Sequence, residues 1–155
     1  MSVMLLSGCA HRPDPAAASP QIYDPRADGN AQLTAALAQA KRDGKRVLLN
    51  LGANWCGDSQ AMYRLLRNDP DIRRELERHY VLVLVDVNKR GDAPRNAEVV
   101  SRFGDPLGRG IPVLLVLAAD GTLLNADPSE RLADNDHQDP ARVLAYLRKW
   151  ANARP

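Results

Sequence analysis

Cys56 is the residue of this chain with the most reactive side chain, and its neighbours favour that reactivity. It lies between an apolar run at residues 47–51 and a stretch of helical spacing at residues 59–67. A cysteine at the start of a helix gains from the helix dipole and from free backbone N–H groups, and both favour the thiolate. Asp58 acts in the opposite sense, because a nearby negative charge disfavours a second one. A thiolate here can attack a disulfide.

The residue three positions after Cys56 limits what this thiol can do. Cys56 is followed three residues later by Ser59, where a Cys-x-x-Cys motif would carry its second sulfur. Ser59 can donate a hydrogen bond to the Cys56 sulfur, but its hydroxyl cannot expel a product by forming a disulfide. The pair therefore predicts chemistry that uses one thiol.

Alternating helical and strand patterns surround this site. Helical spacing appears at residues 30–43, 59–67, 70–79, 96–103 and 140–151, and apolar strand-like runs at 47–51, 80–87 and 112–118. A turn at Asp120-Gly121 leads into a further short strand at residues 122–124. Strands joined through helices should be parallel, and the hairpin adds antiparallel pairing. This order predicts an α/β fold: a three-layer α/β/α sandwich with a mixed sheet of four to five strands.

Two motifs on these elements resemble the thioredoxin-like family. Trp55-Cys56 stands at a strand-to-helix turn, and Gly110-Ile111-Pro112 stands just before the third long strand. The resemblance covers residues 30–152. It implies a thioredoxin-like fold in which Pro112 is cis and packs against Cys56, and in which Ile111 offers backbone hydrogen bonds to a substrate chain.

The same resemblance implies roles for the site residues and shows where this chain departs from the family. It makes Cys56, Ser59 and Trp55 the catalytic positions, and Ile111, Pro112, Gly57 and Asp58 the substrate-binding positions.

Three departures bear on activity. Ser59 replaces the resolving cysteine, Asn50 stands where a buried Asp is common, and Gly52 stands where a Trp is common. The loop at residues 105–109 is longer than the family pattern and should border the substrate groove.

Together these features predict thiol–disulfide exchange through Cys56 alone, with mixed disulfides to protein thiols or to small thiols such as glutathione. An alternative is a binding module of the same fold that holds partner proteins without turnover. A third interpretation follows from the Cys-Gly-x-Ser form of residues 56–59, which monothiol glutaredoxins share. The Gly-Gly glutathione motif of those proteins is missing after Pro112. No cofactor is expected.

The N-terminal residues predict a targeting sequence followed by a flexible tether. Leu6-Ser7-Gly8-Cys9 resembles a bacterial lipoprotein box, in which the cysteine is lipidated after cleavage, although no Lys or Arg precedes it. Residues 10–29 are rich in Pro and Ala and should form a flexible tether, leaving residues 30–152 as the domain. We therefore expect a monomer anchored by lipid at Cys9 in the bacterial periplasm or cell envelope, with the outer membrane as the first site.

Charge and composition exclude several other classes. The net charge is +2 with both signs mixed along the chain, which does not favour a nucleic-acid partner. No apolar run approaches the roughly 20 residues of a membrane-spanning helix. The three His and two Cys are scattered, and the acidic loop at residues 125–138 lacks the ligand pattern of an EF-hand. No metal site is predicted.

Overall fold

The structure, a computed structural model, describes residues 21–88, 95–132, 136 and 138–153. Its elements are α1 (Gly29–Asp43), β1 (Arg46–Gly52), α2 (Gly57–Asn68), α3 (Pro70–His79), β2 (Tyr80–Asp86), α4 (Ala97–Arg102), η1 (Pro106–Arg109), β3 (Val113–Leu117), η2 (Pro128–Glu130) and α5 (Pro140–Ala151). The order of long helices and strands is the predicted one.

Local chemistry sets the helix ends. The Asp69 carboxylate caps α3 by accepting from the backbone N–H groups of Asp71 and Ile72, and proline occupies the first helical position. Asp139 and Pro140 begin α5 in the same way. Gly44, with φ 64°, ends α1 in the left-handed conformation.

The sheet has the order β2-β1-β3, with β1 in the centre. β1 and β2 are parallel, with register from Arg46 opposite Tyr80 to Gly52 opposite Asp86. β3 is antiparallel to β1. β1 ends at Gly52, and the chain continues from there through Cys56 into α2.

The predicted sheet of four to five strands is wrong for the described residues, which form three. After β3, only Leu117 and Leu123 form an isolated bridge. The Asn125 side chain explains this result, because its Oδ1 accepts from Val116 N at 2.9 Å and its Nδ2 donates to Leu114 O at 3.0 Å. A side chain thus takes the backbone groups that another strand would have used.

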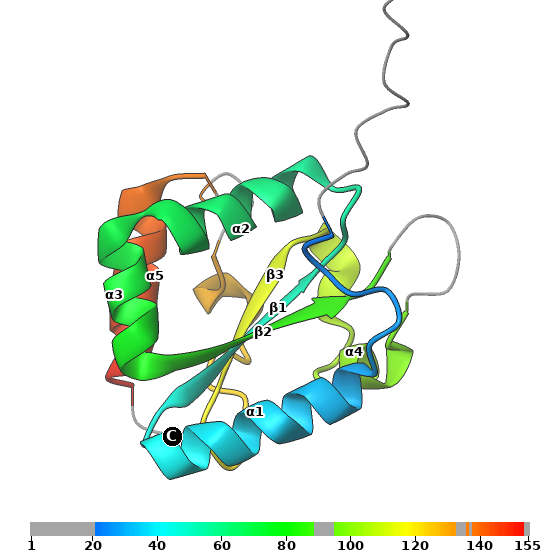
Figure 1. The fold of residues 1–155 in the computed structure, drawn as a ribbon, viewed down its shortest axis with the longest axis horizontal. Helices are drawn as coiled ribbons and strands as arrows, with labels where there is room; N and C mark the ends of the chain where they lie inside the picture. The colour runs from blue at the N-terminus through cyan, green and yellow to red at the C-terminus, as the bar shows by residue number, and fades with distance from the viewer. Residues whose placement is uncertain (1–20, 89–94, 133–135, 137, 154–155) are drawn as a thin grey trace, which may run out of the picture.

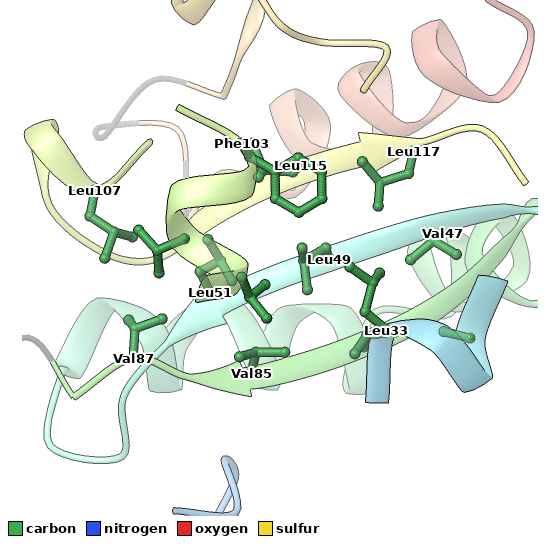
Figure 2. Close-up of a cluster of buried hydrophobic side chains, with 14 of the residues drawn as sticks. Leu33, Val47, Leu49, Leu51, Val85, Val87, Phe103, Leu107, Leu115 and Leu117 are labelled. Carbon is green, nitrogen blue, oxygen red and sulfur yellow. The ribbon is translucent and has the colours of Figure 1, made fainter. Parts of the chain in front are cut away.

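Helices cover both faces of the sheet, as predicted for a three-layer sandwich (Figure 1). Val47, Leu49 and Leu51 of β1 point to the face covered by α1 and α4, where the cluster in Figure 2 forms. Leu48 points to the opposite face, into the cluster built with α2, α3 and α5. Asn50 alternates with Leu49 and so lies on that second face, beneath α2.

The domain begins earlier than the predicted boundary between residues 29 and 30. Tyr23 is fully buried, and Asn54 binds the backbone of Ile22 and Tyr23. The segment from residue 22 is thus part of the domain, because an aromatic side chain in it fills a space in the core. The lipobox and residues 10–20 of the predicted tether lie outside the described residues.

Of the helices in the described part of the chain, none has both the length and the apolar character needed to cross a membrane.

Candidate functional site

Cys56 sits at the junction of the central strand and α2. It is the N-cap residue of α2, with φ −83° and ψ 117°, and its side chain makes no capping bond. The residue is 9 % exposed and its thiol is free. The positive end of a 12-residue helix therefore faces this sulfur.

The cis-proline loop meets Cys56 from the other side. The Ile111–Pro112 peptide bond is cis, which confirms the prediction. The Cys56 thiol donates to the Ile111 carbonyl oxygen at 3.5 Å. The two motifs, far apart in sequence, thus meet at the contact between the Cys56 thiol and the Ile111 carbonyl.

Ser59 is placed differently from what the sequence suggested. It is fully buried, and its Oγ accepts from Ala53 N at 3.4 Å. A hydrogen bond from Ser59 to the Cys56 sulfur is not among those made by the described residues. Ser59 Oγ and the Tyr23 hydroxyl both border the space beside Gly52, where a Cβ atom would lie 2.9 Å from the first and 2.3 Å from the second.

Tyr23 is a site residue that sequence reasoning missed. Its hydroxyl donates to Asn50 Oδ1 at 3.1 Å, directly behind the Cys56 turn. Burial raises the pKa of Tyr23 far above its ordinary value, and the nearby charges of Cys56 and Asp86 add to the rise. The phenol therefore remains protonated at neutral pH and acts as a hydrogen-bond donor.

Asn54 fixes this tyrosine to the active-site turn. Its Oδ1 accepts from Ile22 N and Tyr23 N, both at 2.8 Å, and its Nδ2 donates to Tyr23 O at 2.7 Å. Asn54 is two residues before Cys56, so these hydrogen bonds connect the N-terminal segment to the active-site turn. The sequence held one signal for this arrangement: Gly52, which leaves space where the family commonly has Trp.

The remaining predicted site residues, Trp55, Gly57 and Asp58, are more exposed than Cys56. Gly57 and Asp58 are exposed in the first turn of α2, and Trp55 is half-buried. Gln138 Nε2 donates to Asp58 Oδ1 at 3.1 Å, which links the start of α2 to the segment before α5.

A groove of about 720 Å³ runs beside the cis-proline loop. It is lined by residues of the 103–110 loop, by Pro112 and the start of β3, and by the 126–132 segment. Residues of the 105–109 loop line it. Arg109 and Arg131 supply positive charge to its lining, and Asp105 supplies negative charge. Within the described ranges, no three His, Cys, Asp or Glu side chains are grouped closely enough to hold a metal ion.

Comparison with known proteins agrees with this geometry. The sequence profile of thioredoxin-like proteins matches residues 28–119, which include both Cys56 and Pro112. The chain therefore belongs to the thioredoxin-like family.

Among curated proteins, the chain is 32 % identical over 125 residues to the thiol:disulfide interchange protein DsbD of Klebsiella pneumoniae. That match covers 81 % of this chain but only 19 % of DsbD.

Among solved structures, a disulphide isomerase from Xylella fastidiosa Temecula1 is similar, with a TM-score of 0.71 and 33 % identity over 83 % of this chain and 95 % of that one. A thioredoxin from Thermus thermophilus gives a TM-score of 0.56 and 26 % identity, covering 75 % of this chain and 81 % of that one.

Proposed function

We propose that this protein carries out thiol–disulfide exchange through the single thiol of Cys56. The observation that carries the proposal is the placement of Cys56 at the N-terminus of α2, in contact with the cis Ile111–Pro112 loop. The names of the DsbD and disulphide isomerase relatives support the same class of reaction.

The first step is attack by the Cys56 thiolate on a substrate disulfide. One S–S bond breaks, a new S–S bond joins Cys56 to the substrate, and the leaving thiolate takes a proton from solvent. The helix terminus favours the attacking anion. The Ile111 carbonyl oxygen, which now accepts the thiol proton, loses that bond when the thiolate forms.

Release requires a second thiol from outside the chain. Ser59 stands where a resolving cysteine would attack, and it is buried and uncharged. A substrate thiolate or a small thiol such as glutathione attacks the mixed disulfide and expels Cys56 as thiolate, so Cys56 ends unchanged. When the attacking thiol belongs to the substrate, the net reaction is isomerisation of substrate disulfides.

The groove supports a protein substrate. Its position beside Pro112 lets an extended chain reach the Ile111 backbone, and its size exceeds what a lone thiol needs. The same groove favours a second candidate function, a binding module that holds partner proteins without turnover.

Turnover of a disulfide-bonded peptide with excess glutathione separates these functions. Exchange should run slowly in the wild type and stop in Cys56→Ala, while peptide binding persists. Equal turnover in the two proteins would contradict the exchange function and favour the binding module.

We also propose a location in the bacterial periplasm or envelope, with a lipid anchor at Cys9 and a monomeric domain. The lipobox sequence at residues 6–9 supports the anchor. A tether ahead of residue 21 would then give the domain reach from the membrane surface.

A further inference from the structure

The segment that follows Asn125 forms one wall of the groove beside the cis-proline loop. Asn125 is fully buried and is fixed to β3 by its side chain, whose Nδ2 also donates to the Tyr146 hydroxyl oxygen at 2.8 Å. Residues of the 126–132 segment then line the groove. The position of this wall is therefore set by a buried side chain.

Arg131 is held in this wall by two backbone carbonyl groups. Its Nε donates to Asn125 O at 3.3 Å, and its Nη2 donates to Ala126 O at 3.1 Å. A guanidinium group has five N–H donors in a rigid planar arrangement, so these two bonds leave further donors for a ligand. The residue is only half-buried. Its charge is thus positioned in the lining of the groove and accessible there.

The acidic residues of this wall are engaged with other partners. Glu130 Oε1 accepts from Lys149 Nζ at 3.2 Å, and Asp127 Oδ1 accepts from Ser129 N and Ser129 Oγ, both at 2.8 Å. Neither acid is among the described residues that line the groove, whereas Arg131 is. The wall therefore presents a positive side chain to the groove although it contains two acidic residues.

The 103–110 loop adds one charge of each sign to the lining. Arg109 is exposed at the end of η1, and Asp105 is exposed just before η1 begins. The described lining thus has two arginines against one aspartate, which leaves a net positive charge. Apolar side chains, among them Pro112 and Leu132, complete it. This combination suits an extended polypeptide that carries a carboxylate.

We infer that the groove selects protein substrates with an acidic side chain in the segment beside their disulfide, and that Arg109 and Arg131 determine this specificity. Arginine binds carboxylates through two parallel N–H···O bonds, which gives a geometric preference as well as a charge preference. The inference rests on the proposed function, because it names the substrate class of the same site.

The groove is continuous in sequence with the contact to the thiol. Gly110 and Pro112 line it, and both are neighbours of Ile111, whose carbonyl oxygen contacts the Cys56 thiol. A chain lying in the groove therefore brings its disulfide toward the sulfur while its flanking residues lie among the charged side chains. Glutathione also carries carboxylates, so the experiment measures it separately.

Binding is measured by fluorescence anisotropy with the full chain carrying Cys9→Ser. The labelled peptides have serine in place of cysteine, so no disulfide forms. One peptide has Asp on both sides of this serine, and the other has Asn. The chain should bind the Asp peptide on the order of tenfold more tightly, and this preference should fall as salt is raised.

Substitutions in the lining should move the preference in opposite directions. Arg109→Gln should weaken binding of the Asp peptide about threefold and leave the Asn peptide unchanged. Asp105→Asn should strengthen binding of the Asp peptide about twofold. Asn adopts the left-handed conformation of Asp105, with φ 52°, as readily as Asp does. Arg131→Gln should also weaken binding, but it removes two hydrogen bonds of the wall, so the other two variants decide the test.

Arg42→Gln is the matched control. Arg42 is exposed in the last turn of α1, at the end of β1 away from Cys56. The change removes the same charge from the molecule and should leave the preference as it is. Equal binding of the two peptides by the unsubstituted groove would overturn the inference, as would an Arg42→Gln effect as large as that of Arg109→Gln.

The same peptides carrying a disulfide test the proposed function separately. A chain that prefers the Asp peptide but forms no mixed disulfide with either peptide would contradict the exchange reaction and leave the specificity of the groove intact. Equal binding together with equal mixed-disulfide formation would overturn the specificity and leave the exchange reaction intact. An Arg109→Gln effect confined to the reaction with oxidised glutathione would overturn the assignment to protein substrates.

Discussion

At the scale of single residues, the identity of residue 59 decides what the thiol can do. Ser59 and Asn50 are both fully buried, and neither side chain carries a charge. Attack by a second thiolate from this position would occur at high effective concentration, which an external thiol cannot match. In the exchange reaction that we propose, the missing sulfur should therefore slow release more than attack.

Restoring that sulfur should restore dithiol chemistry. Reduction of insulin with dithiothreitol should run near background in the wild type, and Ser59→Cys should raise it on the order of tenfold or more. Adding Asn50→Asp should raise it further, because a carboxylate can accept the proton of the buried second thiol. Each variant is checked for folding by circular dichroism. A wild type that already matches a two-cysteine thioredoxin would mean that Cys56 has another resolving route.

At the scale of elements, the N-terminal segment and the end of β1 form one packed unit. Tyr23 enters the space above Gly52, and Asn54 holds the backbone of the same segment with three hydrogen bonds. The active-site turn is thus supported by residues that precede the first helix. Because Gly52 and Asn50 belong to β1, this contact joins the N-terminal segment to the central strand as well as to the active-site turn.

A double-mutant cycle tests this contact. Gly52→Ala should destabilise the wild type by ~1–3 kcal/mol, because the new methyl group overlaps the Tyr23 phenol. In a Tyr23→Ala background the same change should cost less, because only the close approach to Ser59 Oγ at 2.9 Å remains, and urea unfolding of the four proteins gives the coupling energy. Equal costs in both backgrounds would show that Tyr23 does not occupy this space.

The elements that sequence predicted well are those set by local chemistry. Prolines with a preceding aspartate begin α3 and α5, and Gly44 ends α1, so their bounds could be inferred from a few neighbouring residues. The loss of the predicted strand at residues 122–124, and the burial of Tyr23, could not be inferred in this way. Both depend on contacts between distant segments: the Asn125 side chain binds the edge of β3, and the phenol fits a space left by Gly52.

The same contrast holds at the site. Cys56, Ile111 and Pro112 were predicted because two short motifs marked them, and the structure brings them together. The burial of Tyr23 beside Gly52 was not predictable, because the sequence placed Tyr23 in a flexible tether.

At the scale of the whole molecule, buried tyrosines link stability to alkaline pH. Burial raises the pKa values of Tyr80 and Tyr146 well above their ordinary value of about 10. Above that pH the unfolded chain releases these protons while the folded chain keeps them, so stability falls as pH rises. Below about pH 10, Tyr80 and Tyr146 make their full contribution to the free energy of unfolding.

The decrease in the free energy of unfolding with rising pH can be measured by urea unfolding between pH 9 and pH 11 (about one unit either side of the ordinary tyrosine pKa). Tyr80→Phe should be less stable than wild type at the lower pH, since it loses a buried hydrogen bond. Above pH 10 the difference in the free energy of unfolding between wild type and Tyr80→Phe should decrease by about 1.4 kcal/mol per pH unit. A gap that stays constant with pH would contradict the raised pKa of Tyr80.

Attachment to a membrane is a second property of the whole molecule. Expressed in a bacterium with an envelope, the full chain should fractionate with membranes, and Cys9→Ala should release it to the soluble fraction. Cys56→Ala is the control for loss of a cysteine and should stay with the membranes. Soluble wild-type protein with an unmodified Cys9 would contradict the proposed anchor.

The central claim is that Cys56 forms a mixed disulfide that the chain itself cannot resolve. Intact mass spectrometry of the Cys9→Ser chain after reaction with oxidised glutathione tests it most directly. The account predicts one glutathione adduct, located on Cys56, that persists after the excess reagent is removed and disappears when an external thiol is added. Absence of an adduct at pH values where Cys56 is alkylated, or spontaneous loss of the adduct without added thiol, would contradict the claim.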